Sequence, residues 1–540
     1  MPDPGLTLRA AGLALLLPAL GAAAQGSPSL PGPETPADGS APVAGLRAVG
    51  ETVVTPSGAY RGQSLGDVLV FRGIRYAAPP VGPLRWRPPE PLPPHAGEEA
   101  ATAFGPPCLQ LDDDGRFFGS EDCLFLNVWA PAGPALSPGR PVLFFVHGGG
   151  NVQGEGSKLI YDGRHLARSQ GVVVVTVNYR LAALGTLAHP FLDRESERGV
   201  SGNYGLLDLL AALRWVRENG PAFGADPERL LLFGESAGAV NTCALLSSPL
   251  ARGLFSAALM QSGGCHQPSL DDVEAFGETI VQAAGCASTD LDGVRACMRA
   301  LSAEAVLSAV PAVVSVASSS GQLYGPAVDG WVLPASPYEA LREGTHNHVP
   351  FAVGANADET SRSVPPIPTE AAYEAAVFAQ FGLLAPLVLR EYPASAFESP
   401  QKAFVAVTTD ARFVCPSRRI ARAAARSQSE PVFRYYFTHT LDSSAASAYG
   451  AFHGLELPFV FGTIDVPGFV PSAAERDLSR AMGHAWASLA RWGRPEVPGA
   501  EWPRYDPATD PYARFGNGVG TGEGVRTERC DFWDRLAGEP

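Results

Sequence analysis

Short runs of apolar residues recur along the first half of the chain, and stretches with helical spacing separate them. The runs at 142–146 and 172–177 are almost entirely apolar, which is typical of strands buried on both faces of a parallel sheet. Between Tyr204 and Asn219 apolar residues return every three or four positions and lead into a third run at 230–233, which predicts a helix followed by a strand. This alternation predicts an α/β fold, an open sheet with helices on both faces.

Weaker patterns extend the sheet in both directions. The segment 53–70 has hairpin character because turn residues at 56–58 and at Gly62 interrupt its short apolar segments. Alternating apolar residues predict a strand over 121–129. Further strands are expected at 257–260, 349–354 and 431–439, and an amphipathic helix at 474–492. The sequence contains no internal repeat, phosphate-binding loop, dinucleotide fingerprint or zinc-ligand spacing.

The N-terminus has the pattern of an export signal. One basic residue, Arg9, precedes an apolar run that ends in three alanines at 22–24, and the run is too short to span a bilayer comfortably. We therefore expect a signal peptide over 1–24, a flexible leader rich in Pro, Gly and Ser over 25–44 and one enzyme domain over 45–540. A secreted or periplasmic protein without an integral membrane anchor follows.

Bulk composition limits the choice of partner. The chain has 540 residues, of which 46% are hydrophobic and 18% charged, and its net charge is -15. These proportions are those of a large globular protein. The negative charge argues against nucleic acid or an anionic membrane as a partner.

A glycine-flanked serine, Gly234-Glu235-Ser236-Ala237-Gly238, directly follows the apolar run at 230–233. This pattern is typical of a sharp turn between a strand and a helix that presents a serine hydroxyl as a nucleophile. In a chain with 59 glycines, the pattern alone does not distinguish a nucleophile from a serine in an ordinary turn. Ser236 is therefore a candidate that depends on the rest of the sequence.

Several separate motifs accompany this turn in a fixed order. They lie at 71–86, 121–129, 146–150, 178–181, 202–208, 223–227, 253–255 and 261–263. Together they resemble the type-B carboxylesterase and cholinesterase family of α/β-hydrolases, from about Thr52 to Leu536. The resemblance implies a large, mostly parallel central sheet, helices on both faces, an N-terminal β-hairpin region and long loop and helix insertions. It also implies hydrolysis of small-molecule esters without a cofactor or metal.

The family places its catalytic residues in the order serine, acid, histidine. A serine hydroxyl is a poor nucleophile near neutral pH and needs an adjacent base. By resemblance the nucleophile is Ser236 and the base is His453, which lies in the motif at 452–462. Two other histidines, His147 beside a glycine run and His439 in a predicted strand, are expected to have structural roles.

The acid implied by the resemblance is Glu359, in the motif at 354–360. It follows a predicted strand, where open α/β sheets place their active-site loops. Asp358 is the neighbouring competitor. Thr360 stands where the family usually has glycine, so the path of this loop is open.

The glycine run after the strand at 142–146 and the residue after the nucleophile match the family's oxyanion hole. The resemblance assigns the hole to the backbone N–H groups of Gly149, Gly150 and Ala237, because a side chain on either glycine would block the carbonyl oxygen. Asn151 stands where the family commonly has an aromatic residue and is a candidate for the substrate pocket. Glu235 is a second pocket candidate. It either tunes the catalytic histidine or has a buried structural role.

Eight cysteines in a chain with an export signal permit disulfides. Spacing alone leaves the pairing open. The resemblance implies the pairs Cys108–Cys123, Cys286–Cys297 and Cys415–Cys530. Cys243 and Cys265 remain, either as a fourth pair or with Cys243 as a small buried apolar residue. The resemblance also implies the ion pairs Arg85–Glu121 and Arg180–Asp208.

The sequence thus predicts a secreted serine carboxylesterase that acts through an acyl-enzyme intermediate. One alternative is a lipase-like or bulky-ester-specific hydrolase, although the loop between Cys108 and Cys123 is short and acidic and argues against a large lid. That loop also has no tryptophan to stack on a quaternary ammonium, so choline esters are not the expected substrate. A more remote alternative is a non-catalytic recognition domain, which would not need all three catalytic positions filled. The natural ester and the oligomeric state do not follow from the sequence.

Overall fold

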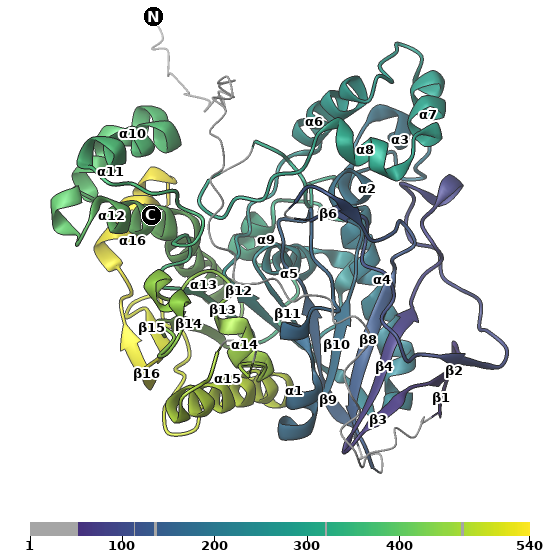
Figure 1. Ribbon diagram of the computed structural model, residues 1–540, viewed down its shortest axis with the longest axis horizontal. Helices are drawn as coiled ribbons and strands as arrows, with labels where there is room; N and C mark the ends of the chain where they lie inside the picture. The colour runs from purple at the N-terminus through teal and green to yellow at the C-terminus, as the bar shows by residue number, and fades with distance from the viewer. Residues whose placement is uncertain (1–51, 113, 134–137, 319–320, 466–468, 540) are drawn as a thin grey trace, which may run out of the picture. The chain divides into compact units, whose positions relative to one another are not determined.

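The computed structural model describes residues 52–539 except 113, 134–137, 319–320 and 466–468. The predicted signal peptide over 1–24 and leader over 25–44 lie outside the described residues. An 11-stranded sheet organises the remainder (Figure 1). Its spatial order is β16-β15-β14-β13-β12-β11-β9-β10-β8-β4-β3.

The seven neighbouring strands from β10 to β15 are parallel, and antiparallel strands flank them at both edges. The parallel strands are β9 (Arg140–Val146), β10 (Val173–Val177), β11 (Ala225–Glu235), β12 (Ala257–Gln261), β13 (Phe351–Asn356), β14 (Val432–Phe437) and β15 (Pro511–Gly516). The antiparallel strands are β3 (Gln63–Leu65), β4 (Val68–Arg75), β8 (Phe125–Pro131) and β16 (Gly518–Glu523). The predicted strands at 142–146, 172–177 and 230–233 are confirmed as the buried centre of this sheet.

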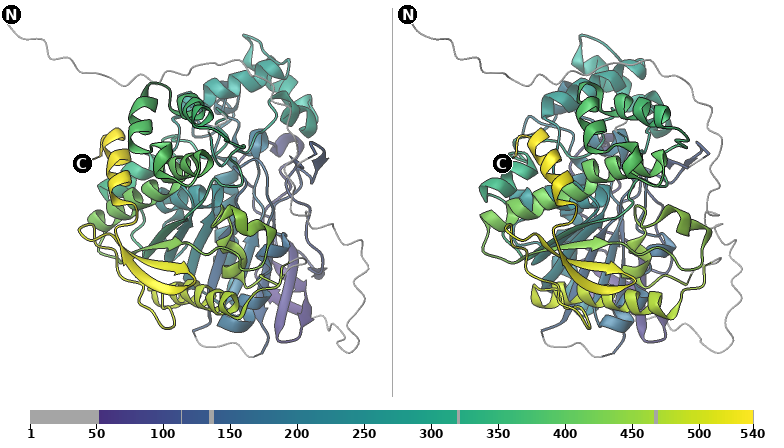
Figure 2. Two further views of the ribbon diagram at one scale, coloured as in Figure 1. Left: turned by 60° about the vertical axis from the view of Figure 1, so that its left-hand side comes forward. Right: turned by 90° about the vertical axis from the view of Figure 1, so that its left-hand side faces the viewer.

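The predicted hairpin is divided between two sheets. β1 (Thr52–Thr55) and β2 (Gly58–Arg61) form an antiparallel pair that also contacts β5 (Glu98–Ala100). The rest of the predicted segment enters the large sheet as β3 and β4. In Figure 2 these N-terminal strands and the C-terminal β15 and β16 occupy opposite edges of the fold.

The strand predicted over 121–129 begins only at Phe125. Side-chain contacts hold the residues before it in a loop, because Glu121 accepts two 2.6 Å hydrogen bonds from Arg85 and Cys123 is bonded to Cys108. The Arg85–Glu121 ion pair that the resemblance implied is therefore confirmed. So is the buried Arg180–Asp208 pair, at 2.7 Å.

Helices cover both faces of the sheet, as predicted. One face packs on α4 (Tyr204–Asn219), α5 (Ala237–Ser247), α9 (Pro337–Glu343) and α13 (Cys415–Ser427), and the other on α1 (Arg164–Gln170), α14 (Glu456–Phe461) and α15 (Ala473–Trp492). Adjacent residues of one strand point to opposite faces. Accordingly Phe144 belongs to the first core and Phe145 to the second.

Further helices lie in insertions whose bounds the sequence patterns did not predict. They are α2 (Ala182–Thr186), α3 (Pro190–Asp193), α6 (Leu270–Ala283), α7 (Leu291–Ala300), α8 (Ala303–Ala309), α10 (Glu370–Phe381), α11 (Ala385–Glu391), α12 (Pro400–Thr409) and α16 (Thr527–Leu536). Figure 1 shows α6 to α8 and α10 to α12 on opposite sides at the top of the view. Most of these helices follow β12 and β13, so they build up the end of the sheet where the parallel strands terminate.

One segment in the described part of the chain, Glu370–Glu391, has the length and the mean hydropathy, 1.5, of a membrane span. A break at Gly382, whose φ is +52°, divides it into α10 and α11. These helices have 12 and 7 residues, whereas a span needs about 20. Neither helix can therefore cross a bilayer alone.

Four disulfides join all eight cysteines. The pairs are Cys108–Cys123, Cys243–Cys265, Cys286–Cys297 and Cys415–Cys530. Three of them are the pairs that the resemblance implied, and the fourth resolves the alternative left open for Cys243. Cys243 is fully buried, but it is bonded rather than free, and it ties α5 to the segment after β12.

Candidate active site

Ser236 lies at the sharp turn between β11 and α5. Its backbone has φ 58° and ψ -122°, a conformation that costs energy in any residue other than glycine and is typical of an exposed nucleophile. The flanking glycine at 238 is required because a Cβ there would lie 2.0 Å from the carbonyl oxygen of Val146. The turn is thus pressed against the end of β9, and Ser236 N donates to Gln261 O at 2.9 Å.

The glycine run after β9 lies directly beside this serine. A Cβ on Gly148 would be 2.9 Å from the Cβ of Ser236, and one on Gly149 would be 2.2 Å from Gln153 O. Within the part of the chain that the structure describes, the backbone N–H groups of Gly149, Gly150 and Ala237 donate to no partner. Unused donors next to a serine hydroxyl suit the oxyanion of an acyl-transfer transition state.

His453 and Glu359 are joined twice. His453 Nδ1 lies 2.6 Å from Glu359 Oε2, and the backbone N–H of His453 donates to Glu359 O at 3.1 Å. Glu359 is fully buried, and its other oxygen accepts from Asn356 N at 2.7 Å. The competing carboxylate of Asp358 instead accepts from Ala451 N at 3.1 Å. The geometry therefore places Glu359, and not Asp358, against the histidine.

Thr360, which stands where glycine is usual, fits without opening the loop. Its side chain is fully buried, and its Oγ1 lies 2.6 Å from Thr408 Oγ1 on α12. Where glycine would have no side chain, Thr360 thus forms a contact with α12. Glu359, one residue earlier, still contacts His453 Nδ1.

Glu235 lies on the other side of the histidine. Its Oε1 is 3.1 Å from His453 Nε2, close enough for an ion pair although not aligned as a hydrogen bond. Among the described residues no hydrogen bond joins the Ser236 hydroxyl to His453. Such contacts are often long in enzymes without substrate and shorten when substrate binds. His453, Glu359 and the turn at Ser236 thus lie together, and Glu235 is the second carboxylate at the imidazole.

A cavity of about 680 Å³ opens onto His453 and Glu359. Its apolar lining comes mainly from Leu111, Val152, Leu307, Val313, Val314 and Val316. Asn151 does not line this cavity. Its side chain is 6% exposed and accepts from Asn241 Nδ2 at 2.8 Å, so a contact between Asn151 and substrate stays a prediction.

The model of the carboxylesterase family matches residues 50–533.

The chain belongs to the carboxylesterase family.

Its relatives include the fumonisin B1 esterase of Sphingopyxis macrogoltabida, 39% identical over 492 residues that cover 87% of each chain. The para-nitrobenzyl esterase of Bacillus subtilis (strain 168) is 35% identical over 478 residues, which cover 85% of this chain and 93% of that protein. A solved PNB esterase structure superposes with a TM-score of 0.78 at 30% identity and covers 89% of this chain and 99% of the other. The predicted α/β-hydrolase fold is confirmed, and the protein is a carboxylic ester hydrolase of the type-B family.

Burial and neighbouring carboxylates shift the protonation of the carboxylesterase site. Burial raises the pKa of Glu235 to about 7, although the charge of His453 opposes the shift. Burial disfavours protonated His453, but the charges of Glu235 and then Glu359 outweigh it and raise the pKa of His453 to about 9. Because only neutral imidazole can accept the serine proton, activity should rise with pH into the alkaline range.

Replacing Glu235 with glutamine should move the acid limb of the pH–activity profile to lower pH. The change removes the strongest contribution that raises the pKa of His453, and an adjacent opposite charge is typically worth about one unit or more. The measurement is kcat/KM for p-nitrophenyl butyrate from pH 5 to pH 10, corrected for spontaneous hydrolysis. Glu343→Gln, at the exposed end of α9, is the control for lost charge. A limb that stays in place or moves to higher pH would contradict this account of Glu235.

Two polar residues beneath the carboxylesterase site were not predicted from the sequence. Asn356 donates from its backbone to Glu359 and from its side chain to Glu456 at 2.6 Å, and Glu456 also accepts from Gln261 Nε2 at 3.1 Å. Burial, then the charges of Glu235 and Glu359, raise the pKa of Glu456 to about 8. The sequence held a signal for Glu456, since this residue lies three positions after His453 in the same motif at 452–462.

His147 forms a hydrogen bond to the glycine run that follows β9. It is buried, its Nδ1 donates to Gly148 O at 2.9 Å, and its ring stacks on Tyr179 with centroids 4.5 Å apart. Burial lowers its pKa to about 3, so it remains neutral. These contacts agree with the structural role expected for it.

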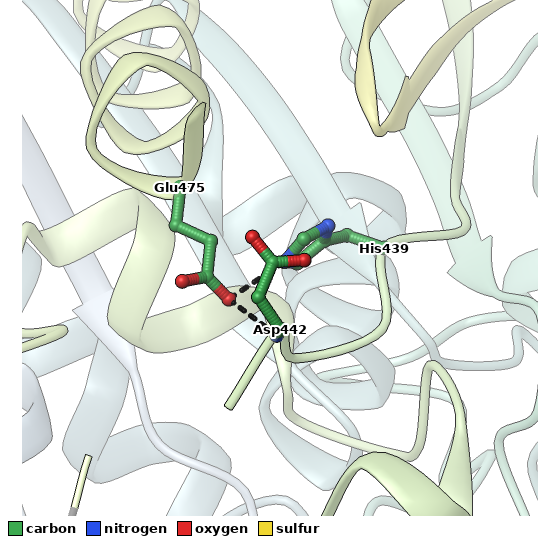
Figure 3. Close-up of side chains that lie close together, drawn as sticks. All are labelled: His439, Asp442 and Glu475. Atoms are coloured by element: carbon green, nitrogen blue, oxygen red, sulfur yellow. Dashed lines mark hydrogen bonds and ion pairs between the residues drawn. The ribbon is translucent and has the colours of Figure 1, made fainter. Parts of the chain in front are cut away.

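His439 belongs to a separate cluster with Asp442 and Glu475 (Figure 3). Their ligand atoms lie within 4.8 Å of one another, which is the spacing of a possible metal site. Hydrogen bonds account for the cluster, however. Glu475 accepts from His439 Nε2 and Asp442 N, each at 3.0 Å, and from Ser472 N at 2.7 Å as the capping box of α15. We therefore assign the cluster to helix capping.

Proposed function

We propose that this carboxylesterase is an exported serine hydrolase that works through an acyl-enzyme, with Ser236 as nucleophile, His453 as base and Glu359 as acid. The observation that carries the proposal is the 2.6 Å contact between His453 and the buried Glu359, both of which line the cavity. A buried carboxylate at Nδ1 holds the imidazole in the tautomer that leaves Nε2 free to accept a proton.

In the first half of the reaction the Ser236 oxygen attacks the ester carbonyl carbon while His453 Nε2 takes the hydroxyl proton. The carbonyl oxygen becomes an oxyanion, and the N–H groups of Gly149, Gly150 and Ala237 donate to it. The tetrahedral intermediate collapses, the ester C–O bond breaks, and the alcohol leaves with the proton from His453. Glu359 accepts the hydrogen bond from Nδ1 throughout and stabilises the imidazolium that forms between these steps.

In the second half a water molecule replaces the alcohol. His453 takes a proton from the water, which attacks the acyl carbon, and the same backbone donors hold the second oxyanion. The bond to Ser236 then breaks, the serine recovers its proton, and the acid is released. Each oxyanion donor of this kind is worth on the order of 10² to 10³ in rate.

Four disulfides support export, because such bonds persist in oxidising compartments. They indicate an extracellular or periplasmic protein. In the proposed scheme residues 1–24 are removed as a signal peptide, 25–44 form a leader, and 45–540 form the enzyme.

The substrate proposed is a small-molecule ester with an apolar portion, since valine and leucine side chains dominate the cavity lining. The loop between Cys108 and Cys123 forms only a small hairpin of β6 (Gln110–Leu111) and β7 (Phe117–Phe118). Gln110 and Leu111 line the cavity wall, and a hairpin of this size does not supply the large amphipathic lid of a lipase. This favours an esterase over the lipase-like alternative.

A covalent label tests the nucleophile directly. An alkyl fluorophosphonate should inactivate the enzyme with one adduct per chain, and peptide mapping should find it on Ser236. Ser262 provides an internal comparison, because it also has a positive φ, 54°, and a buried hydroxyl without a partner in the described chain. Labelling at Ser262 or at no serine would overturn the proposed mechanism.

A further inference from the structure

One charged side chain in the catalytic cavity has no role in the mechanism above. Arg362 lines the same cavity as His453 and Glu359 and follows Glu359 by three residues. It forms no hydrogen bond or ion pair with any residue that the structure describes, and within the described chain its guanidinium stacks on aromatic rings. A guanidinium has five N–H donors, so all of them are free for a ligand.

Two aromatic rings hold this guanidinium next to the catalytic base. Its central carbon lies 5.0 Å from the ring centroid of Phe452 and 6.0 Å from that of Tyr449. Phe452 directly precedes His453, and the neighbouring Ser361 donates to Tyr449 O at 2.6 Å. Stacking of this kind orients a guanidinium while leaving its edge donors exposed.

The other charged groups of the cavity wall are already engaged. Asp112 Oδ1 accepts from the backbone N–H groups of Asp114 at 3.0 Å and Arg116 at 2.7 Å, which ties the carboxylate into its own turn. Glu359 uses both oxygens, on Asn356 and on His453. Arg362 is therefore the one charged side chain lining the cavity, in the described part of the chain, that has no polar protein partner.

We propose that Arg362 forms an anion subsite, and that this carboxylesterase prefers esters carrying a free carboxylate near the bond that is cleaved. A guanidinium pairs with a carboxylate through two parallel N–H···O bonds. The carboxylate belongs to the acid part or to the alcohol part of the ester, and both share this chemistry. The inference rests on the proposed function, because Arg362 acts on a substrate that Ser236 attacks.

The test compares esters that differ by one charge. For the acid part, the pair is the mono-p-nitrophenyl ester of glutaric acid and the same compound with its free carboxyl methylated. For the alcohol part, the pair is 4-acetoxybenzoate and its methyl ester. In Arg362→Gln, kcat/KM for the charged member of the preferred pair should fall about tenfold more than for the neutral member, the usual size of a charge-assisted contact.

Two further variants separate recognition from structure. Arg362→Lys keeps the charge but loses the paired N–H donors of the guanidinium. Its preference for charged over neutral esters should therefore lie between those of wild type and Arg362→Gln. Arg390→Gln, on the exposed surface of α11, removes the same charge outside the cavity and should leave the preference unchanged. Added salt should weaken the wild-type preference and have little effect on that of Arg362→Gln.

An equal loss on charged and neutral esters in Arg362→Gln would overturn the proposal, because it would show that Arg362 only braces the loops around His453. The proposal would also fail if Arg362→Gln left the ratio of kcat/KM for the charged ester to kcat/KM for the neutral ester unchanged in both pairs. Neither outcome affects the proposed function, since wild type would still hydrolyse the neutral esters. Failure of wild type on the neutral esters, together with no phosphonate label on Ser236, would overturn both.

Discussion

Ser236→Ala should lower kcat/KM for p-nitrophenyl acetate and p-nitrophenyl butyrate by on the order of 10⁵-fold or more, the loss found when a nucleophile of this kind is removed. The hydroxyl is the atom that forms the acyl-enzyme, and no neighbouring group in the described site replaces it. The residue sits at a strained turn with φ 58°, which alanine can adopt at a similar cost, so the midpoint of thermal unfolding should change little.

Ser262→Ala is the matched control, because Ser262 occupies a similar strained turn after β12 with φ 54°. It should retain most of the activity. If the wild-type enzyme and Ser236→Ala hydrolysed both esters equally slowly, the assignment of an esterase site to this turn would fail.

Glu359→Gln should lower kcat by about 10³- to 10⁴-fold, as the loss of the triad carboxylate does in serine hydrolases. A glutamine amide in the place of Oε2 offers an N–H to His453 Nδ1, so the histidine would carry its proton on Nε2 and could not accept the serine proton. The imidazolium would also lose its buried counter-ion. The measurement is single-turnover hydrolysis of p-nitrophenyl butyrate at a fixed alkaline pH.

Asp358→Asn is the control at the adjacent position. Its side chain accepts a hydrogen bond from Ala451 N, which an asparagine oxygen can also accept, so the loss of activity should be small. The opposite order of effects would identify Asp358 as the acid and would contradict the position of Glu359.

The elements that position the serine were predictable because local chemistry dictates them. The run at 142–146 is buried on both faces, and the helix at Tyr204–Asn219 has the same bounds in the structure as in the sequence pattern. The glycine-flanked motif predicts a sharp turn at Ser236, and the structure gives the reason for glycine at 238, since a side chain there would collide with Val146 O. Where backbone sterics or unbroken periodicity decide the structure, one sequence is sufficient.

The features that the sequence did not reveal depend on contacts between distant segments. Cys243 and Cys265 lie 22 positions apart without a spacing that identifies their pairing. The bond from Asn356 to Glu456 spans 100 residues, and the free guanidinium of Arg362 is recognised only when every neighbouring acid has a known partner. The bounds of α10 and α11 do not follow from periodicity either, because apolar residues in and between them are exposed, such as Phe378, which is 51% exposed, and Leu383, which is 100% exposed.

The Cys108–Cys123 bond has a consequence beyond stability. It closes the base of the β6–β7 hairpin, which contributes Gln110, Leu111 and Asp112 to the cavity wall but no catalytic group. Reduction of this one bond would loosen a wall of the substrate cavity while leaving His453 and Glu359 in place. We therefore expect reducing conditions to change the range of esters accepted before they change the chemical step.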